Sequence, residues 1–294
     1  MDPLELRIEP LTTVAQFHAC ETLQRRAWQM DGDNDIVPLH LLVTFQRSGG
    51  LVLGAFDEQG EMVGTLFGFL GSTDDAADQL KHCSHMMGVR ADWRGRGVGQ
   101  RLKLAQREHA LRQGLDRVTW TYDPLESLNA ALNIRKLGGV CNTYVRDLYG
   151  DMSDGQNADL GSDRFQLDWW IASGRIKERL AGTAVRPTLA GLLDQDAVLL
   201  NPAELDPGGP PRPAPADLPP AAEAVLVEIP ADIQSIKAAD VALTREWRVH
   251  TRAVFERCFA AGFTVVDFVS ETAGDAASGL RRSFYVLRRD FKVD

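Results

Sequence analysis

The sequence predicts an α/β fold, with a central mixed sheet flanked by helices and a smaller C-terminal α/β unit. Three observations lead to it. Short apolar runs of strand length recur along the chain, and longer stretches with helical spacing lie between them. A glycine-rich turn joins one such strand directly to one such helix. The order strand, turn, helix, strand, helix around it is typical of α/β proteins.

The residues before that turn supply a strand, two helices and a hairpin. Thr12 or Thr13 is a suitable N-cap for the first helix, and the sequence DEQG is a turn between two apolar runs. The predicted elements are a strand at 4–8, helices at 13–29 and 39–46, and strands at 51–56 and 62–70.

The elements around the turn are a strand at 84–89, a helix at 98–113, a strand at 117–122 and a helix at 127–137. Glycine follows each of the two helices, at Gly114 and at Gly138, and is a common residue at a helix C-terminus.

The second half of the chain contains a break in composition at residues 201–220, which hold eight of the 14 prolines. Proline cannot donate to a backbone ladder, so this segment predicts an exposed connector or a long loop. The elements beyond residue 163 are strands at 165–171, 198–200, 225–229, 263–269 and 283–287, and a helix at 239–261.

That long helix has an apolar stripe on one side and Arg245, Arg248 and Arg252 on the other. The pattern predicts a solvated arginine face, with recognition of a carboxylate as the alternative.

Composition limits the class of protein. The chain has 294 residues, 44% hydrophobic and 25% charged, with a formal charge of -9. This excludes a general polyanion binder, so we expect no nucleic-acid partner. No apolar run is long enough to span a membrane and the first residues are not typical of a signal peptide, so we expect a cytoplasmic protein without a membrane partner. The four cysteines are scattered and predict free, buried thiols rather than a metal clip.

The turn Arg94-Gly95-Arg96-Gly97-Val98-Gly99 is the motif that carries chemistry. Its glycines let backbone N–H groups turn inward, and the following helix adds the positive end of its dipole. Such a turn is suited to bind a pyrophosphate. Position 100 is Gln and no G-K-[ST] follows, which excludes the dinucleotide fingerprint and the P-loop.

The segment V-R-A-D-W-R-G-R-G-V-G, residues 89–99, resembles the end of the fourth strand and the pyrophosphate loop of the GNAT superfamily of acyl-coenzyme A dependent N-acyltransferases. The resemblance covers about residues 4–149. Beyond residue 163 the chain is similar to the extension of long bacterial members, which are mostly uncharacterised.

The resemblance implies a GNAT-like sheet and acetyl-CoA or another acyl-CoA as co-substrate, with no metal. It also implies which residues hold the coenzyme. These are Met87, Gly88 and Val89 for the thioester and pantetheine, Arg94, Gly95, Arg96, Gly97, Val98 and Gly99 for the pyrophosphate, and Asn129 near the start of a later helix. The tyrosine and phenylalanine that usually close the last family motif are replaced here by Ile134 and Gly139.

The catalytic candidates are a base and three acids. His85 lies on the coenzyme strand in phase with Met87 and Val89, and its ordinary pKa suits a general base; a hydrogen-bonded core histidine is the alternative. Tyr122, Tyr144 and Tyr149 are candidate acids, each with a structural role as the alternative.

The acidic loop with Asp31, Asp33 and Asp35 follows the first helix and is suited to hold a cationic amine; a solvated turn is the alternative. The expected acceptor is a small-molecule amine or an amino acid.

Two domains are expected: residues 1–150 as the acyltransferase domain and 151–294 as the extension. A non-catalytic CoA-binding or regulatory module remains the second hypothesis. The oligomeric state, a homodimer included, is left open.

Overall fold

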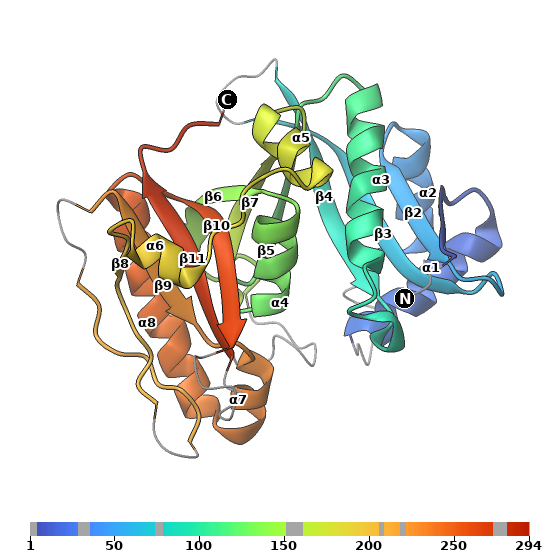
Figure 1. The fold of residues 1–294 in the computed structure, drawn as a ribbon. Coiled ribbons are helices and arrows are strands. Elements are labelled where there is room, and N and C mark those ends of the chain that lie inside the picture. The colour runs from blue at the N-terminus through green and yellow to red at the C-terminus, as the bar shows by residue number, and fades with distance from the viewer. Residues whose placement is uncertain are drawn as a thin grey trace. The chain divides into compact units, whose positions relative to one another are not determined.

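The computed structural model describes residues 5–28, 36–73, 79–150, 161–205, 209–217, 222–272 and 281–293. The chain forms two compact units (Figure 1). Unit 1 contains residues 1–120 with 153–158 and 170–172, and unit 2 contains 121–152, 159–169 and 173–294. Unit 2 is the larger because it takes in residues 121–152 as well as the C-terminal half. The boundary near residue 150 stays a prediction.

Unit 1 is built on a mixed sheet. Antiparallel ladders join β1 to β2, β2 to β3 and β3 to β4, and β4 pairs with β5 in parallel. This confirms the predicted central mixed sheet. The strands are β1 (Arg7–Pro10), β2 (Leu51–Phe56), β3 (Met62–Ser72), β4 (Leu80–Val89) and β5 (Arg117–Tyr122), the last of which ends in unit 2.

Helices cover both faces of this sheet (Figure 1). The apolar cluster under α1 (Val14–Trp28) and α2 (Leu39–Arg47) includes Phe17, Leu42 and Phe67. The cluster under α3 (Val98–Arg112) includes Leu66, Val98 and Leu102. Leu66 and Phe67 are neighbours on β3 and therefore point to opposite faces. Because side chains alternate between the two faces along β3, each β3 residue and the β4 residue paired with it can be assigned to one face.

The strands of unit 2 are hydrogen-bonded in the order β7, β6, β10, β11, β9, β8. Its strands are β6 (Val140–Val145), β7 (Arg164–Trp170), β8 (Val198–Leu199), β9 (Ala224–Ile229), β10 (Phe263–Thr272) and β11 (Arg281–Arg289). Its helices are α4 (Ser127–Ala130), α5 (Gly174–Ala181), α6 (Leu189–Leu193), α7 (Ile233–Ala239) and α8 (Val241–Ala260).

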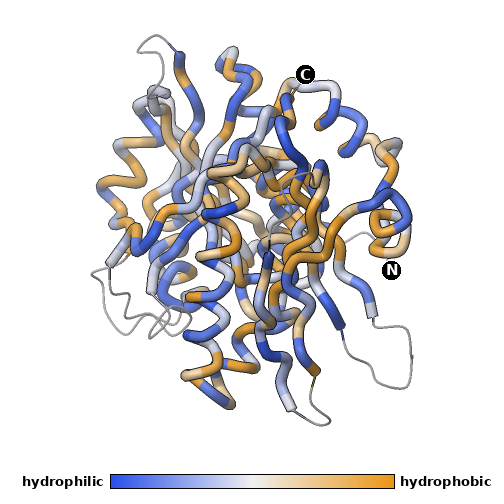
Figure 2. The backbone as a smooth tube through the Cα atoms, turned by 90° about the vertical axis from the view of Figure 1, so that its left-hand side faces the viewer, coloured by the Kyte–Doolittle hydropathy of each residue, from blue (hydrophilic) through white to orange (hydrophobic). Residues whose placement is uncertain are grey.

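The core of unit 2 is aromatic. The rings of Phe165 and Phe255 meet edge to face with centroids 4.7 Å apart, and Tyr285 lies 5.3 Å from Phe255. In Figure 2 orange and blue alternate along the coils of the helices. The buried residues of α8 include Leu243, Trp247, Val254 and Phe255, so its apolar stripe faces the core.

The proline-rich segment is tied to α8 where the structure describes it. The indole N–H of the buried Trp247 donates to the Pro211 carbonyl at 2.9 Å, and Ala214 is buried. Arg212, Pro215 and Asp217 are exposed, so the described part of the segment lies at the surface, while its Pro211 carbonyl satisfies the indole of a buried tryptophan.

The helix predicted at 127–137 is interrupted. After α4 the chain continues as a π-helical segment, η2 (Ala131–Lys136), and Gly138 has a φ of 80°. The indole N–H of Trp169 donates to the Leu137 carbonyl at 2.8 Å, which satisfies one of the carbonyls at the helix end.

All four cysteines are free: Cys20, Cys141 and Cys258 are buried and Cys83 is half-buried. Among the helices in the described ranges, none is long and apolar enough to cross a membrane.

Candidate active site

The glycine-rich turn has the geometry of an open anion cradle. Strand β4 ends at Val89, a short 3-10 turn, η1 (Ala91–Trp93), follows, and α3 begins at Val98. Gly95 and Gly97 have φ values of 76° and 82°, a region that favours glycine. A Cβ built on either residue would meet no heavy atom within 4 Å. The first N–H groups of α3 have no partner within the helix, so the turn and the helix end offer donors to an anion arriving from open space.

Arg94 holds the turn to α1 rather than pointing into it. Its guanidinium donates to the Ala27 carbonyl at 2.8 Å and to the Val89 carbonyl at 3.4 Å. A cation at the C-terminal end of α1 also complements the helix dipole. The guanidinium of Arg96 lies 5.2 Å from the ring of Trp93. The turn is therefore fixed on one side by Arg94, which favours main-chain recognition of an anion.

Strand β4 extends past its ladder with β5. The two strands pair only at His82 with Val118 and Cys83 with Thr119 in the part of unit 1 that the structure describes. From Ser84 to Val89, β4 pairs with β3 along one edge and has no described β5 partner along the opposite edge. The backbone groups on that opposite edge are therefore not used by β5.

A β-bulge interrupts β4 at His85. Ser84 lies opposite Gly68 and Met86 lies opposite Phe67, so His85 is the extra residue. Its ring lies 5.7 Å from the ring of Phe67, on the face covered by α1 and α2. Met87 and Val89 pack against the cluster under α3. The predicted phase of His85 with Met87 and Val89 is wrong, because the bulge shifts the alternation by one residue.

The His85 side chain is exposed, and partial desolvation by the groups packed around it lowers its pKa below the ordinary value of 6.5. The imidazole is therefore neutral near pH 7, the form that a general base needs. Its catalytic role stays a prediction.

A cluster of basic side chains lies buried between β4 and α3. The Lys103 ammonium donates to the Ser84 hydroxyl at 2.8 Å and to the Gln106 side-chain oxygen at 3.3 Å, and lies 3.5 Å from the centroid of the Trp120 ring. Burial lowers the pKa of Lys103 well below its ordinary value. Local sequence patterns gave no sign of this cluster, because a lysine on a charged helix is normally solvated.

His82 belongs to the same cluster. It is fully buried, and neither of its ring nitrogens has a hydrogen-bond partner among the described residues. Its Nε2 lies against Gly68, where a Cβ would come within 2.4 Å. Burial, followed by His109 and Lys103, lowers the pKa of His82 to about 4. His82 and His85 lie on opposite faces of β4, and no group of three metal-binding side chains occurs in the residues that the structure covers.

This arrangement predicts an acid-sensitive fold. The unfolded chain binds a proton at His82 near pH 6.5, whereas the folded chain resists it down to about pH 4, so stability falls as the pH drops through this window. We expect His82 to account for a loss of about 3 kcal/mol in the free energy of unfolding between pH 7 and pH 4. Denaturant unfolding of wild type and His82→Leu at both pH values measures it. An equal loss in the two proteins would contradict the assignment.

The three tyrosine candidates lie in unit 2 and are engaged in hydrogen bonds. Tyr122 is buried and its hydroxyl lies 3.3 Å from that of Tyr285. The Tyr144 hydroxyl donates to Asp163 at 2.7 Å, and the hydroxyl of the exposed Tyr149 lies 3.0 Å from that of Thr121. Burial raises the pKa of the Tyr122 and Tyr144 hydroxyls. The acid role of each residue stays a prediction.

Of the remaining predicted site residues, one lies in unit 2 and three lie outside the described residues. Asn129 is exposed on α4 in unit 2. Asp31, Asp33 and Asp35 lie outside the described residues. The structure therefore brings together the turn and β4 within unit 1, and does not test the acceptor site.

Comparison with known proteins agrees with this geometry. Residues 16–136 match the family model of the acetyltransferase (GNAT) family, which is about two fifths of the chain. This region is a GNAT acetyltransferase domain. It includes the turn and continues into α4 and η2 of unit 2. No curated protein sequence matches the chain.

Solved structures similar to this chain are also acetyltransferases. One is the NatC complex bound to Gag peptide and CoA, with 15% identity, 56% of this chain and 98% of that chain covered, and a TM-score of 0.45. Another is the ribosomal-protein-S18-alanine N-acetyltransferase from Escherichia coli, with 16% identity, coverages of 56% and 94%, and a TM-score of 0.43. An aminoglycoside acetyltransferase from a soil metagenome has 21% identity, coverages of 38% and 74%, and a TM-score of 0.34. At these levels no substrate follows for this chain.

The match over residues 16–136 supports acyl transfer in general terms. The space above Gly95 and Gly97 is open, as an anion cradle requires.

Proposed function

We propose that the protein is an N-acyltransferase that moves an acetyl or related acyl group from acyl-CoA to the amine of a small molecule or amino acid. The observation that carries the proposal is the turn at Arg94–Gly99, with positive φ at Gly95 and Gly97, open space above both and the N-terminus of α3 behind them. Main-chain donors in this arrangement suit a pyrophosphate.

The part of β4 that extends past its pairing with β5 is the proposed site for the acyl end of the donor. Met87, Gly88 and Val89 carry backbone groups that no β5 partner uses in the described part of unit 1. In the proposed reaction an N–H of this edge stabilises the oxyanion that forms when the amine attacks the thioester carbonyl. The C–N bond forms, the C–S bond breaks and the coenzyme leaves as a thiolate.

Proton transfer is assigned to His85 as base. Its lowered pKa keeps it neutral and able to accept the proton that the amine loses. A thiol has a pKa of about 8.5, so the thiolate leaves without an obligatory acid. This is consistent with Ile134 at the position where many GNAT members have tyrosine, and with the engaged hydroxyls of Tyr122 and Tyr144. Asn129 and the acidic residues Asp31, Asp33 and Asp35 remain proposed contacts for coenzyme and amine.

The second candidate is a CoA-binding module without catalysis. The hydrogen-bonded hydroxyls of the buried Tyr122 and of Tyr144 favour it. A thiol-release assay with acetyl-CoA and a library of amines and amino acids separates the candidates. We expect thiol release that depends on one class of amine. Binding of acetyl-CoA without thiol release from any amine would favour the module, and no binding would contradict both.

A further inference from the structure

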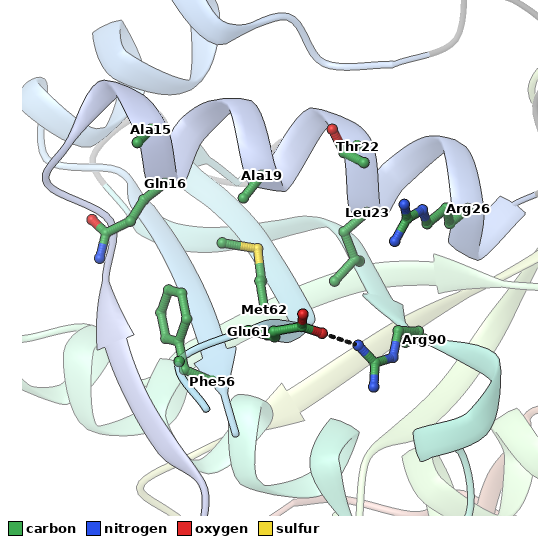
Figure 3. Close-up of a pocket in the computed structure, with 11 residues that line it drawn as sticks. Ala15, Gln16, Ala19, Thr22, Leu23, Arg26, Phe56, Glu61, Met62 and Arg90 are labelled. Carbon is green, nitrogen blue, oxygen red and sulfur yellow. Dashed lines mark hydrogen bonds and ion pairs between the residues drawn. The ribbon is translucent and has the colours of Figure 1, made fainter. Parts of the chain in front are cut away.

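Unit 1 has a cavity that the proposed reaction does not use. It measures about 490 Å³ and lies between α1, the end of β2, the β2–β3 turn and Arg90, which follows β4 (Figure 3). None of its lining residues belongs to the turn at 94–99 or to the β4 segment with His85. Its volume is within the range of small-molecule sites.

The cavity has an apolar floor and a charged end. Leu23 and Phe56, each 4% exposed, and Met62 form the floor with the small side chain of Ala19. Figure 3 shows Arg26, Glu61 and Arg90 gathered toward one end, with Phe56 toward the other. A ligand that fits this arrangement has an apolar body and one polar end.

The charges at that end favour an anion. Arg90 is held by Asp92, at 2.7 and 3.0 Å, and by Glu61 at 3.1 Å. Those bonds use three of its five N–H donors. Arg26 is exposed in the last turn of α1 and has no ion-pair or hydrogen-bond partner among the described residues. Asp92 and Glu61 together balance Arg90, so Arg26 is the cation at this end whose charge no described residue balances.

We propose that this cavity binds a small organic acid with a single carboxylate and an apolar body. The carboxylate accepts hydrogen bonds from Arg26, for which a guanidinium fork is the natural partner, and from the remaining donors of Arg90. The apolar body packs on Phe56 and Met62. Glu61 disfavours a second carboxylate, because like charges at one site repel. The site is independent of the proposed acyl transfer.

The probe is 3-phenylpropionate, titrated into the full chain and followed by ligand-observed NMR. We expect saturable binding at millimolar concentrations or below, with at least tenfold weaker binding of the neutral 3-phenylpropionamide. Arg26→Gln should weaken binding at least tenfold. Arg47→Gln, which removes an exposed cation from the last turn of α2, should leave it unchanged. Ala19→Phe, which fills the floor, should abolish it.

Several results would overturn the proposal. One is the absence of saturable binding to wild type. Another is equal binding to wild type and Arg26→Gln, and a third is equal affinity for the acid and its amide. Displacement of the probe by acetyl-CoA would place it in the coenzyme site instead. Because Arg26 lies outside the turn at 94–99, loss of probe binding with unchanged acetyl-CoA binding separates this site from the proposed function.

Discussion

Arg248→Met should lower the free energy of unfolding by about 3 to 5 kcal/mol. In unit 2 the buried guanidinium of Arg248 donates to both oxygens of the buried Asp123, one of the bonds at 2.9 Å. Removing the arginine leaves a carboxylate without its main counter-charge in a site that water does not reach. The cost of an unpaired buried charge exceeds the net value of most surface ion pairs.

Chemical denaturation measures this loss. Arg245→Met is the matched control, since Arg245 is exposed on the same helix and its substitution should change stability by about 0.5 kcal/mol or less. A loss below about 1 kcal/mol for Arg248→Met would contradict the importance of the buried pair.

His85→Ala should lower kcat/KM by about 10²-fold or more if His85 is the base. The wild-type rate should rise with pH through a pKa below 6.5, as the imidazole loses its proton, and this acidic limb should be absent in the variant. Acetyl-CoA affinity should be nearly unchanged, because the ring lies on the α1–α2 face and the turn is separate from it. The pH–rate profile is the measurement.

His18→Ala, an exposed histidine on α1, is the control for the loss of an imidazole elsewhere. If His85→Ala retains both the rate and the acidic limb, deprotonation proceeds without His85, and the acidic loop at Asp31, Asp33 and Asp35 becomes the next candidate.

Local patterns in the sequence were enough for most of unit 1 and for the anion turn. The strand at 117–122 agrees with β5, and the helix predicted at 98–113 agrees with α3 to within one residue. Both are strongly periodic and end at glycine or proline. The turn was predictable because its glycines follow a strand and precede a helix.

The bulge at His85 was not predictable, because an alternating pattern contains no sign of where a ladder gains a residue. This changed the face on which a candidate base lies.

The ion pairs of the buried Arg248 and the half-buried Arg252 were missed for a different reason. Helical spacing places Arg248 and Arg252 beside the apolar stripe, but their partners, Asp123 and Asp163, come from strand ends far along the chain. Long-range pairing of this kind leaves no local signal. The shallow cavity beside α1 likewise depends on which residues of distant strands face a helix.

The central claim is that the turn at Arg94–Gly99 binds acyl-CoA, and calorimetric titration of acetyl-CoA tests it most directly. Gly97→Val places a branched side chain where φ is 82° and where the pyrophosphate is expected, and should weaken binding at least tenfold. Gly114→Val is the matched control, because Gly114 has a φ of 77° and equally open space but lies beyond the other end of α3. The account predicts lost affinity in Gly97→Val and retained affinity in Gly114→Val; unchanged affinity in a folded Gly97→Val protein would contradict it.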